Sequence, residues 1–292
     1  MPESYDLRDK VVFITGGARG IGAETAKQVV AKGAKVALVG LEPELLEQRV
    51  AELGSGNAAW FEADVTDLPA LVTAADAAVE RFGGIDVTIA NAGIAAVTPL
   101  VDGDVDIFDT IVRVNLGGVY RTFQATLPHV TARSGYVLPV ASLAAAVHAP
   151  MMGAYAATKA GVEALANCLR PEVAPSGTKV GCAYFGFINT DMVRKGFETE
   201  SGRQAADRMG SVGPNHAVPV SKAGKAIVRA IERRARFAYA PRWVIGMLLT
   251  RTLIQPLQER QALKRGVNDL LDMARAEPPT LTTEQPDRTP VA

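Results

Sequence analysis

The sequence predicts an α/β fold, a doubly wound parallel sheet in a single domain with a C-terminal helical extension. Short apolar runs rich in β-branched residues alternate with segments of helical period from residue 11 to about 185, which is the rhythm of repeated βαβ units. The runs are continuous rather than alternating in polarity, as expected for strands covered by helices on both faces. The unbroken alternation favours one domain over two, although 292 residues could form either.

Each strand is expected where an apolar run stands between turn residues. In chain order the predicted strands are VVFIT (11–15), KVALVG (35–40), AAWFEA (58–63), DVTIA (86–90), GYVLPVA (135–141) and KVGCAYF (179–185), with a short further candidate in RFAYAP (236–241). The longer segments between them have helical periodicity and are expected to connect successive strands.

The alternation of apolar runs and helical segments becomes irregular after residue 186, and this change sets the expected boundaries of the domain and its extension. Residues 8–240 are predicted to form the main domain, and within it the polar, weakly periodic segment 190–214 is expected to be a mobile flap. Residues 241–275 are predicted to form amphipathic helices broken near Pro256. The composition of residues 276–292 predicts a disordered tail.

The apolar run WVIGMLLTRTLI (243–254) is interrupted by Arg251 and is shorter than the roughly 20 residues that span a bilayer. Basic residues surround it, so three placements stay open: on a membrane surface, over a binding site, or against another subunit. The basic residues are Arg242, Arg251, Arg260, Lys264 and Arg265.

Composition excludes several classes of function. The chain has 31 basic and 31 acidic residues, so it has no overall attraction to nucleic acid. Its beginning has no apolar segment that could act as a secretory signal, and its only cysteines are Cys168 and Cys182. Two free thiols in the cytoplasm are therefore expected. No metal site is expected, because the scattered histidines and cysteines lack metal-ligand spacing.

A glycine-rich turn, TGGARGIG, follows the first predicted strand. Its glycines, Gly16, Gly20 and Gly22, would let backbone N–H groups and a helix N-terminus approach a pyrophosphate. The spacing G-x-x-x-G-x-G differs from the common dinucleotide pattern G-x-G-x-x-G, so simple turn chemistry is the alternative. The position after the first strand of an α/β chain favours the phosphate-binding interpretation.

Three polar residues in SLAAAVHAPMMGAYAATKAG (142–161) could form a reacting group. Tyr155 and Lys159 are i and i+4 on a predicted helix, so their side chains share a face. A nearby ammonium would lower the pKa of the phenol and make it a usable acid or base. Ser142, at the end of the fifth strand, could hydrogen-bond a substrate oxygen. Taken singly, each residue has an ordinary structural alternative, such as a cap or turn.

The ordered set of TGGARGIG, ANAG (90–93), Asn115 in VNLGG, Ser142 and YAATK (155–159) resembles the short-chain dehydrogenase/reductase family, from about residue 8 to 190. The resemblance implies a Rossmann-like fold and an NAD(P)-dependent oxidoreductase acting on an alcohol or ketone, usually as a dimer or tetramer. It implies that Ser142, Tyr155, Lys159 and Asn115 are catalytic. Asn115 would support a water-linked proton relay, and Lys159 would also hold the nicotinamide ribose.

The resemblance also implies the contacts of the cofactor. Asp64 and Val65 would line the adenine pocket, Asn91 to Gly93 the adenine ribose, and Ile188 and Thr190 the carboxamide. The family usually has Pro-Gly after the sixth strand, whereas this chain has Phe185 before Gly186. The complete expected set is Gly16, Arg19, Gly20, Ile21, Gly22, Gly40, Leu41, Asp64, Val65, Asn91, Ala92, Gly93, Tyr155, Lys159, Gly186, Ile188 and Thr190.

The choice between NAD and NADP depends on the end of the second strand. An acid there would bind the ribose 2′-hydroxyl of NAD and repel the 2′-phosphate of NADP. The position holds Gly40, and Arg19 could pair with a phosphate, so NADP is mildly favoured. Glu42 could act as a substitute acid, which would favour NAD.

The substrate cavity is expected to be apolar and to accept a hydrophobic alcohol or ketone, such as a steroid, a retinoid-like or a long-chain compound. His148 is either a polar group in that cavity or a surface residue. The expected lining residues are Ala144, Ala145, Val147, Met151, Met152, Phe187 and Met192.

Two other functions fit the same fold, a non-catalytic NAD(P)-sensing protein and an epimerase or dehydratase.

Overall fold

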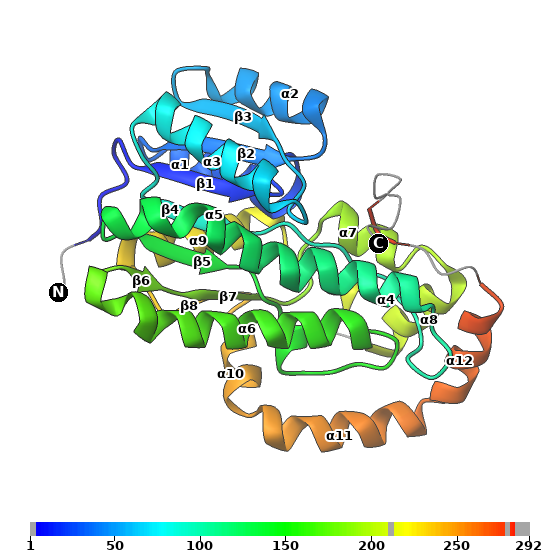
Figure 1. Cartoon of the computed structure of the whole chain (residues 1–292). Helices are drawn as coiled ribbons and strands as arrows, with labels where there is room; N and C mark the ends of the chain where they lie inside the picture. The colour runs from blue at the N-terminus through cyan, green and yellow to red at the C-terminus, as the bar shows by residue number, and fades with distance from the viewer. Residues whose placement is uncertain (1–3, 210–212, 278–280, 284–292) are drawn as a thin grey trace.

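A parallel sheet between two layers of helices forms the centre of the molecule (Figure 1). The computed structural model describes residues 4–209, 213–277 and 281–283. Six strands are hydrogen-bonded in the order β3-β2-β1-β4-β5-β6, and all their pairings are parallel. This confirms the predicted doubly wound α/β fold.

The strands lie where the apolar runs predicted them. They are β1 (Val11–Thr15), β2 (Lys35–Gly40), β3 (Ala58–Glu62), β4 (Val87–Ala90), β5 (Tyr136–Pro139), β6 (Lys179–Val180), β7 (Cys182–Phe185) and β8 (Phe237–Ala240). The sixth predicted run is divided into β6 and β7 at Gly181, and β7 pairs with β8. A side chain at Gly181 would stand 2.1 Å from the Tyr136 hydroxyl and 2.5 Å from the Ala235 carbonyl oxygen, so this crossing requires glycine.

Helices cover both faces of the sheet. One face packs against α3 (Leu68–Phe82), α5 (Gly118–Ala132) and α6 (Gly153–Val173), and the other against α1 (Gly20–Val30), α2 (Pro43–Leu53) and α9 (Val220–Arg233). Each face has its own buried cluster, so strand residues such as Phe13 and Ile14 are fully buried on opposite sides. This explains why the strand runs are apolar throughout.

One long helical segment changes its winding in the middle. It runs from α4 (Val105–Val112) through a π-helical turn, Arg113–Gly117, into α5. Such turns are rare and often stand at functional sites. Here the turn contains Asn115, which is completely buried.

The segment predicted as a flap is largely helical in the structure. It holds α7 (Asp191–Gly196) and α8 (Glu200–Met209), and residues 210–212 of the prediction lie outside the described residues. The 3₁₀ turn Pro214–His216 follows. The segment is rich in charged residues and weakly periodic, so its sequence did not predict these short helices.

The C-terminal part forms α10 (Val244–Leu249), α11 (Arg251–Lys264) and α12 (Val267–Arg275) along one side of the domain (Figure 1). Of the tail predicted to be disordered, residues 278–280 and 284–292 lie outside the described residues. Leu281–Thr283 differ from that expectation, because Thr282 is only 4 % exposed. Contacts with the main domain, which composition does not encode, explain the difference.

The carboxyl ends of β1, β4 and β5 meet at one edge of the sheet, since these strands are parallel neighbours. The loops after Thr15, Ala90 and Pro139 therefore come together. This is where open α/β sheets bind ligands, and the predicted site residues follow these strand ends.

Candidate active site

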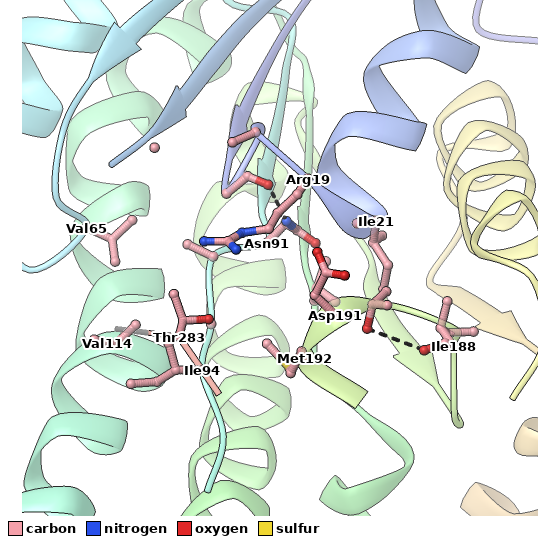
Figure 2. A pocket seen from close by; sticks show the side chains of 18 of the residues that line it. Arg19, Ile21, Val65, Asn91, Ile94, Val114, Ile188, Asp191, Met192 and Thr283 are labelled. Carbon is pink, nitrogen blue, oxygen red and sulfur yellow. Dashed lines mark hydrogen bonds between the residues drawn. The ribbon is translucent and has the colours of Figure 1, made fainter. Parts of the chain in front are cut away.

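A cavity of about 670 Å³ opens at this edge of the sheet (Figure 2). Its walls contain the glycine loop, the strand ends and α7. Every residue in the expected cofactor set lines it except Gly22, and Ser142 lines it as well. The structure thus brings together residues that are up to 174 positions apart, from Gly16 to Thr190.

The glycine loop has the geometry of a phosphate cradle. Gly16 and Gly20 have φ of +65° and +55°, values that side chains disfavour. A side chain at Gly22 would stand 2.1 Å from the Gly16 carbonyl oxygen, so Gly22 maintains the tight turn from behind the cavity wall. The N-terminus of α1 has no side-chain cap and no acid in its first turn. Its free N–H groups and positive dipole end fit a pyrophosphate.

Asn91 ties the loop after β4 to the glycine loop. Its Nδ2 donates to the carbonyl oxygens of Thr15 and Gly16 at 3.1 and 3.2 Å. Its backbone N–H donates to the Thr15 hydroxyl at 3.1 Å. The side chain therefore holds two walls of the cavity at a constant separation.

Asn115 lies behind the cavity rather than in its lining. Its Oδ1 accepts the Ile94 N–H at 2.8 Å, and its Nδ2 donates to the Ile94 carbonyl at 2.9 Å and to the Thr158 hydroxyl at 3.3 Å. Its amide thus fastens the loop after β4 to α6. These contacts hold Asn115 in one orientation, and its role in a proton relay stays a prediction.

Ser142, Tyr155 and Lys159 meet at one end of the cavity. Tyr155 and Lys159 come from adjacent turns of α6, and the Lys159 Nζ lies 5.5 Å from the centre of the Tyr155 ring. Nζ donates to the Val140 carbonyl oxygen at 2.8 Å, which fixes the buried ammonium at the end of β5. The three side chains and the glycine loop share one cavity.

Ser142 combines a structural bond with contact to the phenol. Its Oγ accepts the Ala144 N–H at 3.1 Å and donates to the Phe185 carbonyl at 3.4 Å. A hydrogen bond between Ser142 and Tyr155 lowers the pKa of the phenol. The cap expected from the sequence is therefore present, and the role of Ser142 in a reacting group stays a prediction.

The pKa values differ from the expectation that the ammonium lowers the pKa of the phenol. Burial raises the pKa of Tyr155, and the hydrogen bond with Ser142 opposes this only in part. Burial lowers the pKa of Lys159 to about 8. Removal from water disfavours the charged form of each group, so burial sets the direction of both pKa shifts.

The departure from the family pattern at Phe185 does not displace the next loop. Val218 N–H donates to the Phe187 carbonyl at 3.0 Å, and Asn189 N–H donates to the Val218 carbonyl at 2.9 Å. This pairing holds Ile188 and Thr190 at the cavity wall, where Thr190 caps α7.

An ion pair at the end of β2 was not predicted. Arg19 pairs with Glu42, and Glu42 Oε2 also accepts the Leu41 N–H at 3.3 Å. From the sequence, each of the two residues was expected to be a separate partner of the cofactor. Both side chains line the cavity beside Gly40 (Figure 2 shows Arg19).

Most of the seven apolar residues that were expected to line the substrate cavity do not line it. Of the seven residues, only Met192 lines the cavity. Met151 packs in a separate cluster with Ala205 and Leu270, and Phe187 stacks edge-on against Phe197. Ala145 and Met151 are instead buried in the packing of the domain.

His148 is a surface residue. Its side chain is exposed, its N–H donates to Gln255 Oε1 at 2.9 Å, and its carbonyl accepts from Gln255 Nε2 at 3.3 Å. The residue thus joins the loop before α6 to α11 through its backbone.

Several lining residues have no signal in the sequence. The apolar side chains of Ile94 and Val114 and the tail residue Thr283 lie side by side in the cavity wall (Figure 2). Ile94 directly follows ANAG and Val114 directly precedes Asn115, so proximity to a motif could have found these two. Nothing in the local sequence indicates Thr283. The other lining residues outside the predictions are Ala18, Glu62, Ala63, Val140, Ala141, Asp191, Val193 and Lys195.

Comparison with known proteins decides the family. The model of the family described as short chain dehydrogenase matches residues 10–201. The chain belongs to the short-chain dehydrogenase family. It is accordingly an NAD(P)-dependent oxidoreductase.

Individual relatives agree with this assignment. Trans-4-hydroxycyclohexanecarboxylate dehydrogenase of Sinomonas cyclohexanicum is 34% identical over 202 residues, covering 65% of this chain and 78% of the relative. The solved structure of levodione reductase has a TM-score of 0.74 and 29% identity, covering 80% of this chain and 96% of that one. A Brucella melitensis 3-ketoacyl-(acyl-carrier-protein) reductase complexed with NADH has a TM-score of 0.72 and 26% identity, covering 80% and 97%.

In this short-chain dehydrogenase, no group of three or more His, Cys, Asp or Glu side chains within residues 4–209, 213–277 and 281–283 is placed to hold a metal ion. No helix in those ranges has the length and apolar character needed to cross a bilayer. Cys168 is exposed and Cys182 is buried, and neither forms a disulfide.

Proposed function

We propose that this protein interconverts a hydrophobic alcohol and the corresponding ketone, with Tyr155 as the general acid and base. The observation that carries the proposal is the meeting of Ser142, Tyr155 and Lys159 in the cavity that the glycine loop also lines. When bound, the nicotinamide accepts or supplies the hydride at the substrate carbon. The protein's own residues move the proton and position the substrate.

The proton moves between the Tyr155 hydroxyl and the substrate oxygen. In the reductive direction the phenol donates its proton as the carbonyl oxygen becomes an alcohol, and in the oxidative direction the phenolate accepts it. The Lys159 ammonium, 5.5 Å from the ring centre, stabilises the phenolate by its charge. The Ser142 hydroxyl donates to the substrate oxygen as charge develops.

Apolar side chains support a hydrophobic substrate of the steroid, retinoid-like or long-chain type. Ile94, Val114 and Met192 line the cavity, and most ligand cavities combine such walls with a few polar anchors. The names of two similar proteins, levodione reductase and trans-4-hydroxycyclohexanecarboxylate dehydrogenase, add cyclic ketones and alcohols as the first compounds to test.

Replacing Tyr155 by Phe tests the proposal. The variant should lose at least about a hundredfold in kcat on any cyclic or long-chain alcohol that the protein oxidises, because the proton acceptor is removed. Tyr5→Phe is the matched control, since the Tyr5 hydroxyl has no hydrogen-bond partner in the described residues. Turnover by Tyr155→Phe equal to that of the control would disprove the proposed role.

The same assay separates the alternative functions. Oxidation or reduction changes nicotinamide absorbance at 340 nm in proportion to product, whereas an epimerase or dehydratase forms product without net change. A non-catalytic sensor binds the cofactor and forms no product from any compound of the panel.

We further propose NADP as the favoured cofactor. Gly40 leaves no carboxylate at the end of β2, and Arg19 lies in the cavity where it can pair with a 2′-phosphate. Glu42 opposes this preference, because it pairs with Arg19. Glu42→Gln should therefore increase the ratio of NADPH to NADH affinity in calorimetric titrations. NAD binding more than tenfold tighter than NADP by the unchanged protein would refute the preference.

We propose that two copies of the chain associate through the face formed by α4, α5 and α6, as a homodimer or as half of a homotetramer. A hollow there is lined by Leu116, Tyr120 and Leu165, and the nearby rings of Phe108 and Tyr120 are 38 % and 51 % exposed. Exposed aromatic groups around a hollow are typical of interfaces. Tyr120→Glu should shift sedimentation velocity to a smaller species, and an unchanged profile would refute this surface.

A cytoplasmic location with contact to the membrane surface through residues 242–265 is also proposed. The free thiols fit a reducing compartment. Leu249, Leu253 and Leu257 are 58–77 % exposed at spacings of four, and residues 241–266 hold five basic residues against one acidic. Exposed leucines with surrounding positive charge favour anionic bilayers.

Sedimentation with phosphatidylcholine vesicles tests this contact. Adding phosphatidylglycerol should increase binding, and the double variant Leu253→Glu, Leu257→Glu should abolish it. Leu45→Glu, at a partly exposed leucine on α2, serves as the control. Equal binding by all three proteins would contradict the proposed surface.

A further inference from the structure

The C-terminal segment Leu281–Thr283 is attached to the loop that follows β4. The Thr282 N–H donates to the Ala95 carbonyl at 2.8 Å, and the Ala95 N–H donates to the Thr282 hydroxyl at 2.9 Å. Thr282 is 4 % exposed, and Leu281 packs against the larger hydrophobic core. The two reciprocal hydrogen bonds, the burial of Thr282 and the packing of Leu281 hold this segment in one position.

This attachment places Thr283 in the wall of the active-site cavity. Its side chain lies beside Ile94 and Val114, with Val65 nearby (Figure 2). Asp64 and Val65 are the residues assigned above to the adenine pocket. Since Val65 lies nearby, we assign Thr283 to the adenosine end of the cavity.

The segment closes the cavity without filling it. About 670 Å³ remains with Thr283 in the wall, within the usual range for ligand sites. The cavity as a whole therefore has room for a ligand while the segment is attached, as expected for a wall rather than a plug.

Helix α12 anchors the chain just before this segment. Glu277 accepts the backbone N–H of Ser201 at 3.1 Å and also its hydroxyl, and Arg275 pairs with Asp102. These contacts fasten residues 275–277 to α8 on one side and to the segment before α4 on the other. The Thr282 methyl group also approaches Gly196, at the end of α7.

From these contacts we infer that Leu281–Thr283 is part of the cofactor-binding site and retains the adenosine half of the bound nicotinamide dinucleotide. The inference rests on the proposed assignment of this end of the cavity to the cofactor. A dinucleotide under this wall leaves only when the segment detaches from Ala95. The segment therefore slows dissociation of the cofactor.

Stopped-flow fluorescence with NADPH and NADH tests the inference directly, without a substrate. The dissociation rate constant should rise at least about fivefold in Thr282→Val, which keeps the side-chain shape and removes the acceptor of the Ala95 N–H. A chain ending at residue 280 should show a larger rise, because the whole wall is absent. Thermal midpoints of both variants establish that each is folded.

Thr73→Val provides the matched control, because Thr73 is an exposed helical threonine whose hydroxyl donates to the Pro69 carbonyl far from the cavity. Equal dissociation rates in all proteins would overturn the inference and leave the proposed function intact. Slower dissociation or tighter binding after truncation would overturn it too, since the segment would then be a plug. Failure of the complete chain to bind either cofactor would overturn both.

Discussion

Lys159, a proposed catalytic residue, illustrates how burial of a charged side chain costs stability. Its ammonium is 4 % exposed and makes one hydrogen bond, to the Val140 carbonyl. Burial lowers its pKa from 10.5 to about 8. The unfolded chain therefore holds more protons than the folded one between these values, so stability rises with pH in that window. Below pH 8 the penalty is complete, and it corresponds to about 3 kcal/mol.

Replacing Lys159 by Met should therefore stabilise the protein at pH 7 while abolishing turnover. A net gain of about 2 kcal/mol is expected after allowing about 1 kcal/mol for the lost hydrogen bond. Urea unfolding at pH 7, 9 and 10 checks this, and the advantage of the variant should shrink as the pH rises. Lys27→Met, at an exposed lysine, should show no such trend. A variant less stable than the unchanged protein at pH 7 would contradict the explanation.

Other residues show where sequence reasoning at this scale reached its limit. Tyr155 and Lys159 were paired correctly because the period of one helix determines their relative position. Glu42 and Arg19 were considered separately, because they follow different strands and meet only in the folded chain. The family pattern likewise implied a role for Asn115. Only the structure shows the two hydrogen bonds between its side-chain amide and the Ile94 backbone.

Among the elements, the strands were the most predictable. Each continuous apolar run became a strand, since burial on both faces leaves an unmistakable pattern. The break between β6 and β7 was not predicted, because it results from the close approach of Tyr136 and Ala235 to Gly181. The short helices α7 and α8 were missed because polar residues dominate them.

Asp86 connects several elements at the end of the sheet opposite the cavity. Only 2 % exposed, it accepts the Val11 N–H at 3.0 Å, the Arg133 Nε at 3.2 Å and the Lys10 ammonium at 3.5 Å. It therefore joins the start of β1 to the segment after α5. Removing its carboxylate leaves the buried Val11 N–H without its acceptor and separates Lys10 and Arg133 from their shared partner.

Asp86→Ala should lower the free energy of unfolding by about 3 kcal/mol or more, measured by urea denaturation. Asp86→Asn should be milder, because an amide oxygen can still accept the Val11 N–H. Asp76→Ala removes a carboxylate that is 65% exposed and pairs only with His129 at the surface, so it should change stability by less than about 1 kcal/mol. Equal losses in Asp86→Ala and Asp76→Ala would refute this account.

At the scale of the whole molecule, the C-terminal extension (α10 to α12) precedes Leu281–Thr283, and Thr283 lines the candidate cavity. Leu270 of α12 packs with Met151, before α6, and with Ala205 of α8. This small cluster is separate from the two clusters on the faces of the sheet. The extension can therefore loosen while the sheet remains folded.

Leu270→Ala should accelerate hydrogen exchange in α7 and α8 and leave the sheet amides unchanged. The cavity created costs a few kcal/mol, and local opening absorbs that cost because the cluster is separate. Leu263→Ala, at a leucine 71 % exposed, should alter neither region. Faster exchange throughout the sheet would show instead that the extension belongs to the same cooperative unit.

The amino-acid sequence by itself determined the order of strands and helices, the glycine turn and the pairing of Tyr155 with Lys159. These features depend on periodicity and on spacing within one element, which neighbouring residues encode. Only the tertiary structure decided that Arg19 pairs with Glu42, that His148 faces solvent and that Thr283 lines the cavity. Such contacts join segments far apart in the chain, and they arise from packing and desolvation that no local pattern records.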